Sequence, residues 1–140
     1  MLGGHCIKTW STTQGAIALS SAEAEFYAMV EGALRAKWAT TVAKEMGVRG
    51  VEGALVLGTD SAAAKSFVAR RGLGRMRHLE VRDLWLQREV TQGKISVVKE
   101  KGEENPADTA TKFLQAGQLA ERLWRMGLSV AREGEGACRL

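Results

Sequence analysis

The longest periodic segment of the chain predicts one helix over residues 20–46. Ser20 opens a Ser-Ser-Ala-Glu pattern in which Glu23 stands three residues on, as in a capping box. Ala, Leu, Met, Glu and Lys dominate the residues that follow, and proline is absent. Gly47 supplies the stop, because glycine readily adopts the left-handed conformation that closes a helix.

Shorter patterns predict the other elements. Alternating or continuous apolar runs predict strands at 5–10, 15–19, 54–59 and 94–99. Helical patterns are found at 61–69, 79–91, from Asn105-Pro106 onward, and at 117–126. The glycines of 70–77 predict a loop, and the Gly-rich end after 129 is expected to fray. The order β-β-α-β-α-α-β-α predicts an α/β domain, in which helices pack on a mixed sheet.

Composition is that of an ordinary globular domain. Of the 140 residues, 45% are hydrophobic and 26% are charged. The two cysteines, Cys6 and Cys138, match no metal or redox spacing, so a reduced intracellular protein is expected. No apolar run approaches the roughly 20 residues that span a membrane. With no signal peptide at its start, the chain is expected to be soluble and to have no membrane partner.

Positive charge is concentrated in one segment, although the net charge is only +4. Clustered guanidinium groups offer planar, bidentate donors to phosphate, so this segment predicts a nucleic-acid contact. A solvated basic loop is the alternative. The residues of the cluster are Arg70, Arg71, Arg75, Arg77, His78 and Arg82.

Glu25 is the first candidate for chemistry, because it falls on a small, apolar stripe of the predicted helix. Such a stripe is expected to lie against the sheet. A carboxylate placed there needs a partner, for example a metal ion. The alternative is that Glu25 lies at the rim and reaches into water. The residues that share its side of the helix are Met29, Gly32, Ala36 and Ala43.

Two further carboxylates also lie at element boundaries. Asp60 ends the strand ALVLGTD, and open α/β sheets bind ligands at the carboxyl ends of their strands. The alternative for Asp60 is an N-cap of the next helix. Asp108 falls in the first turn of its helix, where the helix dipole alone would stabilise an acid. Together with Glu25, these carboxylates are suited to a two-metal site for phosphoryl transfer.

Four stretches of the chain, taken in order, carry a family resemblance. They are ALSSAEAEFYAM, TDSAAAKSFV, RMRHLEVRDLWLQREV and GEENPADTATKFL. They resemble the motifs LSS-x-EAEY-x-A, D-N-x-S-A, R-x-K-H-I-D-I-R-x-x-x-I-R-E and E-E-N-x-A-D-x-x-T-K-x-L. Those motifs belong to the ribonuclease H domain of copia-type retrotransposon Pol polyproteins. The resemblance covers about residues 3–114.

The resemblance implies an RNase H-like fold over residues 1–114, followed by a C-terminal helix and frayed tail at 115–140. It also implies hydrolysis of the RNA strand of RNA·DNA hybrids. Glu25, Asp60 and Asp108 would be the catalytic ligands of two Mg²⁺ (or Mn²⁺) ions. One ion would activate water, and the other would stabilise the leaving 3′ oxygen.

Further expectations follow from the same resemblance. Glu25 is favoured over Glu23, because it directly precedes Phe26 at the family's aromatic position. The arginine cluster with His78 would follow the backbone of the hybrid, which is recognised by shape, phosphates and 2′-hydroxyls. A reverse transcriptase portion of the same polyprotein is an expected partner. The cytoplasm or a virus-like particle is the expected location.

The chain departs from the family at its start. The family's first strand carries a catalytic aspartate, whereas here no aspartate precedes Asp60. Residues 99–104 (KEKGEE) also hold no counterpart of the family's flexible histidine. We therefore expect a domain truncated at its N-terminus, which lacks the first strand and has impaired activity. The alternatives are a non-catalytic nucleic-acid-binding remnant and a structural fragment whose carboxylates cap helices.

Overall fold

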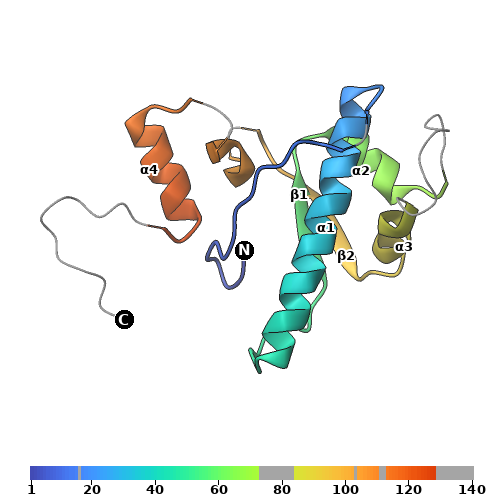
Figure 1. Ribbon diagram of the computed structural model, residues 1–140, viewed down its shortest axis with the longest axis horizontal. Helices are drawn as coiled ribbons and strands as arrows, with labels where there is room; N and C mark the ends of the chain where they lie inside the picture. Colours follow the sequence, from blue (N-terminus) through green and yellow to red (C-terminus); the bar gives the residue numbers. More distant parts are fainter. Residues whose placement is uncertain (16, 73–83, 103, 111–112, 129–140) are drawn as a thin grey trace, which may run out of the picture. The chain divides into compact units, whose positions relative to one another are not determined.

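The computed structural model describes residues 1–15, 17–72, 84–102, 104–110 and 113–128 (Figure 1). The chain divides into two compact units, Thr13–Lys101 and the combination of Met1–Thr12 with Gly102–Leu140. The predicted boundary at residue 114 stays a prediction. None of the helices in the described part is long and apolar enough to cross a membrane.

The unit Thr13–Lys101 is built on a small parallel sheet. Strands β1 and β2 pair from Leu55↔Ile95 to Thr59↔Lys99. Parallel strands need a long crossover connection, which here contains two helices in its described part. The α/β class is thereby confirmed. The elements of this unit are α1 (Ser21–Glu45), β1 (Leu55–Thr59), α2 (Ala62–Ala69), α3 (Trp85–Thr91) and β2 (Ile95–Lys99).

Helix α1 begins where the capping pattern predicts. Ser20 is the N-cap, and its hydroxyl accepts a hydrogen bond of 3.2 Å from the Glu23 backbone N–H. The Glu23 carboxylate in turn accepts a hydrogen bond of 2.9 Å from the N–H of Leu19, one residue before the N-cap. Glu23 is only 1% exposed, so its hydrogen bond with Leu19 at the start of the helix is shielded from water. After the helix, Gly47 takes a φ of +75°, which favours glycine.

The core of this unit lies between α1, α2, α3 and β2. Phe26 of α1 meets Phe67 of α2 edge to face, with ring centroids 4.8 Å apart and planes at 79°. Such a contact stabilises by about 0.5–1.5 kcal/mol beyond the burial of its area. The buried residues of this core are Phe26, Met29, Ala33, Ala64, Phe67, Val68, Leu86 and Ile95.

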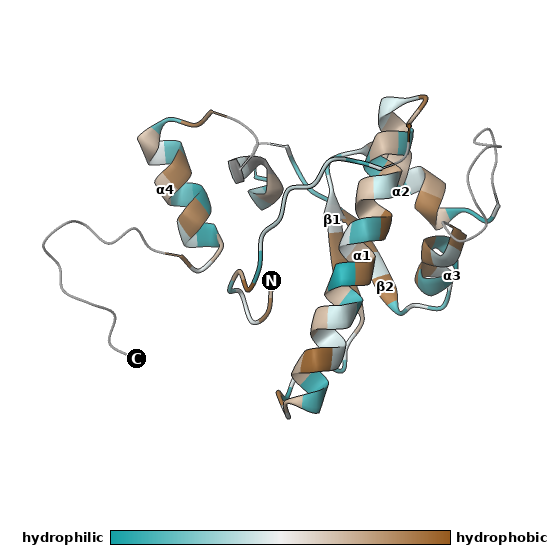
Figure 2. Ribbon diagram, viewed as in Figure 1, coloured by the Kyte–Doolittle hydropathy of each residue, from teal (hydrophilic) through white to brown (hydrophobic). Residues whose placement is uncertain are grey.

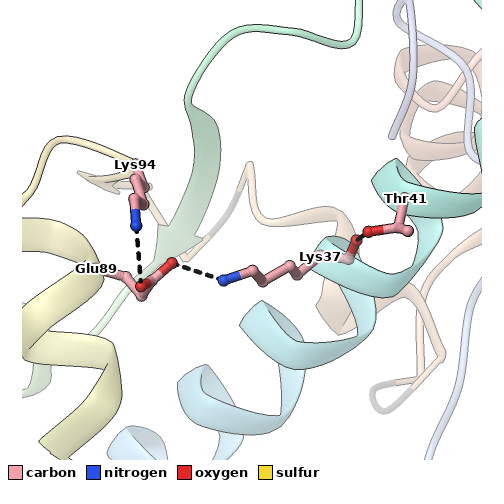
Figure 3. A network of polar contacts seen from close by, with 4 residues as sticks. All are labelled: Lys37, Thr41, Glu89 and Lys94. Carbon is pink, nitrogen blue, oxygen red and sulfur yellow. Dashed lines mark hydrogen bonds and ion pairs between the residues drawn. The ribbon is translucent and has the colours of Figure 1, made fainter. Parts of the chain in front are cut away.

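A buried carboxylate ties three elements of the unit together (Figure 3). Glu89 of α3 is 2% exposed and accepts a 2.8 Å hydrogen bond from the Lys37 ammonium of α1. The ammonium of Lys94, just before β2, lies 3.8 Å from the other carboxylate oxygen. The hydrogen bond and charge of Lys37, with the charges of Lys94 and Arg88, hold the pKa of Glu89 below its ordinary value despite burial. Glu89 is therefore an ionised anchor of this core.

The unit formed by Met1–Thr12 and Gly102–Leu140 contains the 3-10 helix η2 (Pro106–Ala110) and helix α4 (Ala116–Arg125). The Asn105 carboxamide accepts 3.1 Å from the N–H of Ala107, which closes the start of η2. The N–H of Cys6 donates a hydrogen bond of 2.7 Å to the carbonyl of Met126. A backbone hydrogen bond therefore joins the two segments of this unit. Hydrophobic and hydrophilic residues alternate along α4 (Figure 2), and none of its residues is buried.

Most predicted elements are confirmed within a residue or two. Helix 79–91 starts in the described part only at Trp85, and residues 79–83 lie outside it. The helix after Asn105 begins at Pro106 as predicted but is a 3-10 helix. Most of the loop at 70–77 and the tail after 129 also lie outside the described residues.

The two strands predicted at 5–10 and 15–19 are wrong for the residues described there. An isolated bridge between Leu2 and His5 is the only pairing in this region of the described chain. Ile17 is 87% exposed, so the apolar pattern finds no sheet to cover it. Two short strands alone are marginal in water without a third strand or a helix. The described sheet is therefore a parallel pair and not the predicted mixed sheet.

We expect the Lys37→Met substitution to reduce the free energy of unfolding by about 1–3 kcal/mol at neutral pH. The loss arises because the buried Glu89 carboxylate keeps only the more distant Lys94, while the half-exposed Lys37 limits the effect through solvent screening. A lowered folded-state pKa makes the stabilisation complete above about 4.5, the ordinary value. It is lost as the pH falls through the folded-state pKa.

Urea unfolding at pH 7 and at about pH 3 measures this difference between parent and variant. Lys44→Met, which removes an exposed lysine from the last turn of the same helix, is the matched control. Equal losses in the two variants at pH 7, or a difference that persists in acid, would contradict a stabilising Lys37–Glu89 pair.

Candidate functional site

Asp60 lies at the carboxyl end of β1 and is exposed. The N-cap of α2 is Ser61, whose hydroxyl accepts 3.1 Å from the N–H of Ala64. The Thr59 hydroxyl accepts 3.1 Å from the N–H of Ser61, which supports the same turn. The N-cap alternative for Asp60 is therefore wrong. Asp60 forms no hydrogen bond or ion pair with any residue that the structure describes, so its carboxylate is available to a ligand.

Glu25 is exposed on the second turn of α1, so its expected burial against the sheet is wrong. The prediction that this side of the helix lies against the sheet is confirmed further along α1, because a Cβ at Gly32 would lie 3.6 Å from Leu57 of β1. Near its start, however, α1 directs Phe26 toward α2. Successive residues turn by about 100° around a helix, so Glu25 leaves the buried side. Glu23, the other acid of this motif, is buried in the helix cap.

Asp108 belongs to the other unit. It lies in η2, and its side chain is outside the described part of the chain. Glu25 and Asp60 thus share one unit, while the place of Asp108 beside them stays a prediction. Within the described residues, no group of three or more His, Cys, Asp or Glu side chains could hold a metal ion. A two-ion site therefore stays a proposal.

Glu100 is a carboxylate that was not predicted from the sequence. The parallel pairing ends at Thr59↔Lys99, and the N–H of Glu100 donates 2.9 Å to the carbonyl of Thr59. Asp60 therefore directly follows β1, and Glu100 directly follows the paired strand β2. The signal was present, since ISVVKE ends in an acid as VLGTD does.

The first residues of the arginine cluster follow directly after α2. Arg70 and Arg71 are both exposed. The guanidinium of Arg70 lies 4.6 Å from the ring centroid of Phe67, within range of a cation–π contact. Both cations are thus accessible to a phosphate. The other members of the cluster, Arg75, Arg77, His78 and Arg82, lie outside the described residues.

Gln87 of α3 holds this arginine-bearing segment in place. Its amide nitrogen donates one hydrogen bond of 3.0 Å to the carbonyl of Phe67 and another of 3.2 Å to the carbonyl of Gly72. Its amide oxygen accepts 2.9 Å from the N–H of Gly72. Gln87 is 4% exposed, so these bonds are made away from water, where a missing partner is costly. No local pattern in the sequence indicates this role, because the partners lie fifteen and twenty residues away.

We expect Ser61→Ala to reduce the free energy of unfolding by about 1 kcal/mol, because the first turn of α2 loses its cap. Asp60→Asn should stay within about 0.5 kcal/mol of the parent, since Asp60 makes no capping contact. Urea unfolding of the two variants measures both values. A larger loss of unfolding free energy for Asp60→Asn than for Ser61→Ala would show that Asp60 stabilises the fold.

Comparison with known proteins relates most of the chain to a transposon polyprotein. The chain is similar to the Retrovirus-related Pol polyprotein from transposon TNT 1-94 of Nicotiana tabacum, with 31% identity over 111 residues. The match covers 79% of this chain and 8% of the length of that protein. No protein-family model matches the chain. No solved structure matches it. The similarity establishes a relationship to retrotransposon Pol polyproteins.

Proposed function

We propose that this chain is a ribonuclease H-type portion of a retrotransposon Pol polyprotein. In this proposal it hydrolyses the RNA strand of RNA·DNA hybrids. The relationship to a transposon Pol polyprotein supports the proposal. The reverse transcriptase portion of such a polyprotein is the proposed partner, in the cytoplasm or a virus-like particle.

The state of Asp60 is the observation that carries the proposal. Its carboxylate is exposed at the carboxyl end of a parallel strand, and the helix after it is capped by Ser61. A structural role in the cap is thereby removed. Ligands of α/β sheets bind at this end of the strands. A carboxylate at that place, with no partner among the described residues, is suited to hold a cation.

Each residue has a limited task in this proposal. Glu25, Asp60 and Asp108 would hold Mg²⁺ or Mn²⁺ through carboxylate oxygens. Bound ions of this kind would supply an activated water and stabilise the leaving 3′ oxygen. Arg70 and Arg71 would position the phosphate backbone of the hybrid.

The parent chain is expected to cleave a labelled RNA·DNA hybrid in the presence of Mn²⁺. Asp60→Asn and Glu25→Gln should each lower the cleavage rate at least about tenfold, because each removes a proposed metal ligand. The rate is measured by gel analysis of end-labelled RNA, and circular dichroism verifies that the variants are folded. Glu52→Gln, at an exposed carboxylate of the same unit, is the matched control. Equal rates for Asp60→Asn and the parent would show that the site is assigned wrongly.

A non-catalytic nucleic-acid-binding remnant is the second candidate. It is favoured by the two exposed arginines that Gln87 holds at the end of α2. A folded parent that binds the hybrid and leaves it intact would select this candidate. Hybrid recognition through phosphates alone does not require the carboxylates.

We expect the double variant Arg70→Ala/Arg71→Ala to bind the hybrid less tightly and with a weaker dependence on salt. The slope of log K against log salt should fall by roughly 0.9 for each phosphate that the variant no longer neutralises. Fluorescence anisotropy with a labelled hybrid at several salt concentrations measures the slope. Lys44→Ala/Arg49→Ala removes the same charge from other exposed positions of the unit. Identical slopes for both double variants would show that Arg70 and Arg71 act only through net charge.

A further inference from the structure

We infer that Gln87 is a positioning residue for nucleic-acid binding, because it holds Arg70 and Arg71 in the arrangement in which they contact phosphates. The inference rests on the proposed function, since it explains how the same two arginines are prepared for the hybrid. It stands on the three hydrogen bonds of one buried carboxamide and on the backbone conformation of Gly72.

The Gln87 carboxamide joins both ends of the segment that carries the arginines. The carbonyl of Phe67, in the last turn of α2, accepts one of its hydrogen bonds. Gly72, which directly follows the arginines, accepts another and donates the third. Both N–H groups of the carboxamide and its oxygen are thereby used. A rotated amide would bring its oxygen against two carbonyl oxygens, so one orientation satisfies all three bonds.

The backbone of this segment has a conformation that favours glycine at its end. Arg70 is the C-cap of α2 and is extended, with φ −94° and ψ 172°. Gly72 has a φ of +84°, in the left-handed region that other residues rarely adopt. In this conformation both its N–H and its carbonyl reach Gln87. A Cβ at Gly72 would meet nothing within 4 Å, so a larger residue would strain the backbone without disturbing the packing.

The side chains of Arg70 and Arg71 are exposed, although a buried group holds their backbone. Gln87 itself is 4% exposed. The Arg70 guanidinium lies 4.6 Å from the ring centroid of Phe67, which adds a second contact to the same turn. Neither arginine forms an ion pair with any residue that the structure describes. Their charges are therefore accessible to an anion and are not neutralised by the described part of the chain.

Holding this segment lowers the cost of binding a phosphate. A segment that becomes ordered only on binding loses conformational freedom at that moment, and the affinity falls accordingly. Here the order exists before binding, because hydrogen bonds made away from water are costly to break. The number of counterions released depends on charge and not on this order. A loss of positioning therefore lowers the affinity at every salt concentration, whereas a loss of charge changes the salt dependence.

The test is the affinity of the full chain for a labelled RNA·DNA hybrid, measured by fluorescence anisotropy without divalent cations so that the hybrid stays intact. Gln87→Met keeps the length and charge of the side chain but makes none of the three hydrogen bonds. We expect it to bind about three- to tenfold more weakly, because the segment must then be ordered on binding. The slope of log K against log salt should equal that of the parent, since every charge remains. Ser61→Ala, which weakens the other end of α2 at unchanged charge, is the stability control.

Gly72→Ala changes the same segment without changing the core. It should weaken binding to a similar extent, because alanine disfavours a φ of +84°. Gly50→Ala is the matched control, since Gly50 is also exposed, has the same φ and has equally open space around a Cβ. Adding Gln87→Met or Gly72→Ala to the variant Arg70→Ala/Arg71→Ala should cause no further loss, because each change acts through these arginines.

Urea unfolding identifies the variants that fold. Among them, equal affinities of Gly72→Ala and Gly50→Ala, or of Gln87→Met and Ser61→Ala, overturn the inference. A further loss of affinity in the background that lacks both arginines also overturns it, because Gln87 would then affect binding by another route.

Failure of the arginine contact itself gives a different result. If the double arginine variant binds as tightly as Lys44→Ala/Arg49→Ala, or if the parent does not bind the hybrid, the contact and the inference are both overturned. Cleavage of the hybrid and its loss in Asp60→Asn test the proposed ribonuclease activity separately, because binding is measured without the cations that cleavage requires.

Discussion

The edge-to-face contact between Phe26 and Phe67 is the constraint on which the rest of the Thr13–Lys101 unit depends. Both rings are buried, and they join the first turns of α1 to α2. Helix α2 follows β1 with only Asp60 and Ser61 between them, so fixing α2 also fixes the carboxyl end of the strand. The same contact turns Glu25, one residue before Phe26, out of the core. The aromatic pair therefore helps to place Glu25 and Asp60, which are both exposed, at the surface of this unit.

Helix α3 shows how buried polar groups can organise a small core. It has seven residues and no side-chain cap, so it has little intrinsic stability. Glu89 attaches it to α1 and to the start of β2 through lysines, and Gln87 attaches it to the end of α2. Hydrogen bonds have directions, whereas apolar packing does not. These two residues therefore define one arrangement of α3 where apolar contacts alone would permit several.

Elements with local signals could be predicted from the sequence. The Ser20 cap and the apolar alternation of β2 are examples, and both lie where the patterns indicate. Predictions that depended on a distant partner were less successful. Residues 5–10 have the pattern of a strand but find no described neighbour to pair with. Glu100 and Gln87 were missed, because their contacts depend on strand register and on carbonyls at the end of another helix.

The parallel pairing of β1 and β2 has a consequence for how the unit is made. Ile95 pairs with Leu55, a residue about forty positions earlier, so the sheet forms only when the whole crossover has left the ribosome. Until then, α1 and α2 can form turns but have no complete surface to pack on. Closing such a long loop costs entropy before any contact repays it, and pairings of this kind are slow. During that delay, the apolar side of the nascent helices is open to chaperones and to other chains on the same messenger RNA.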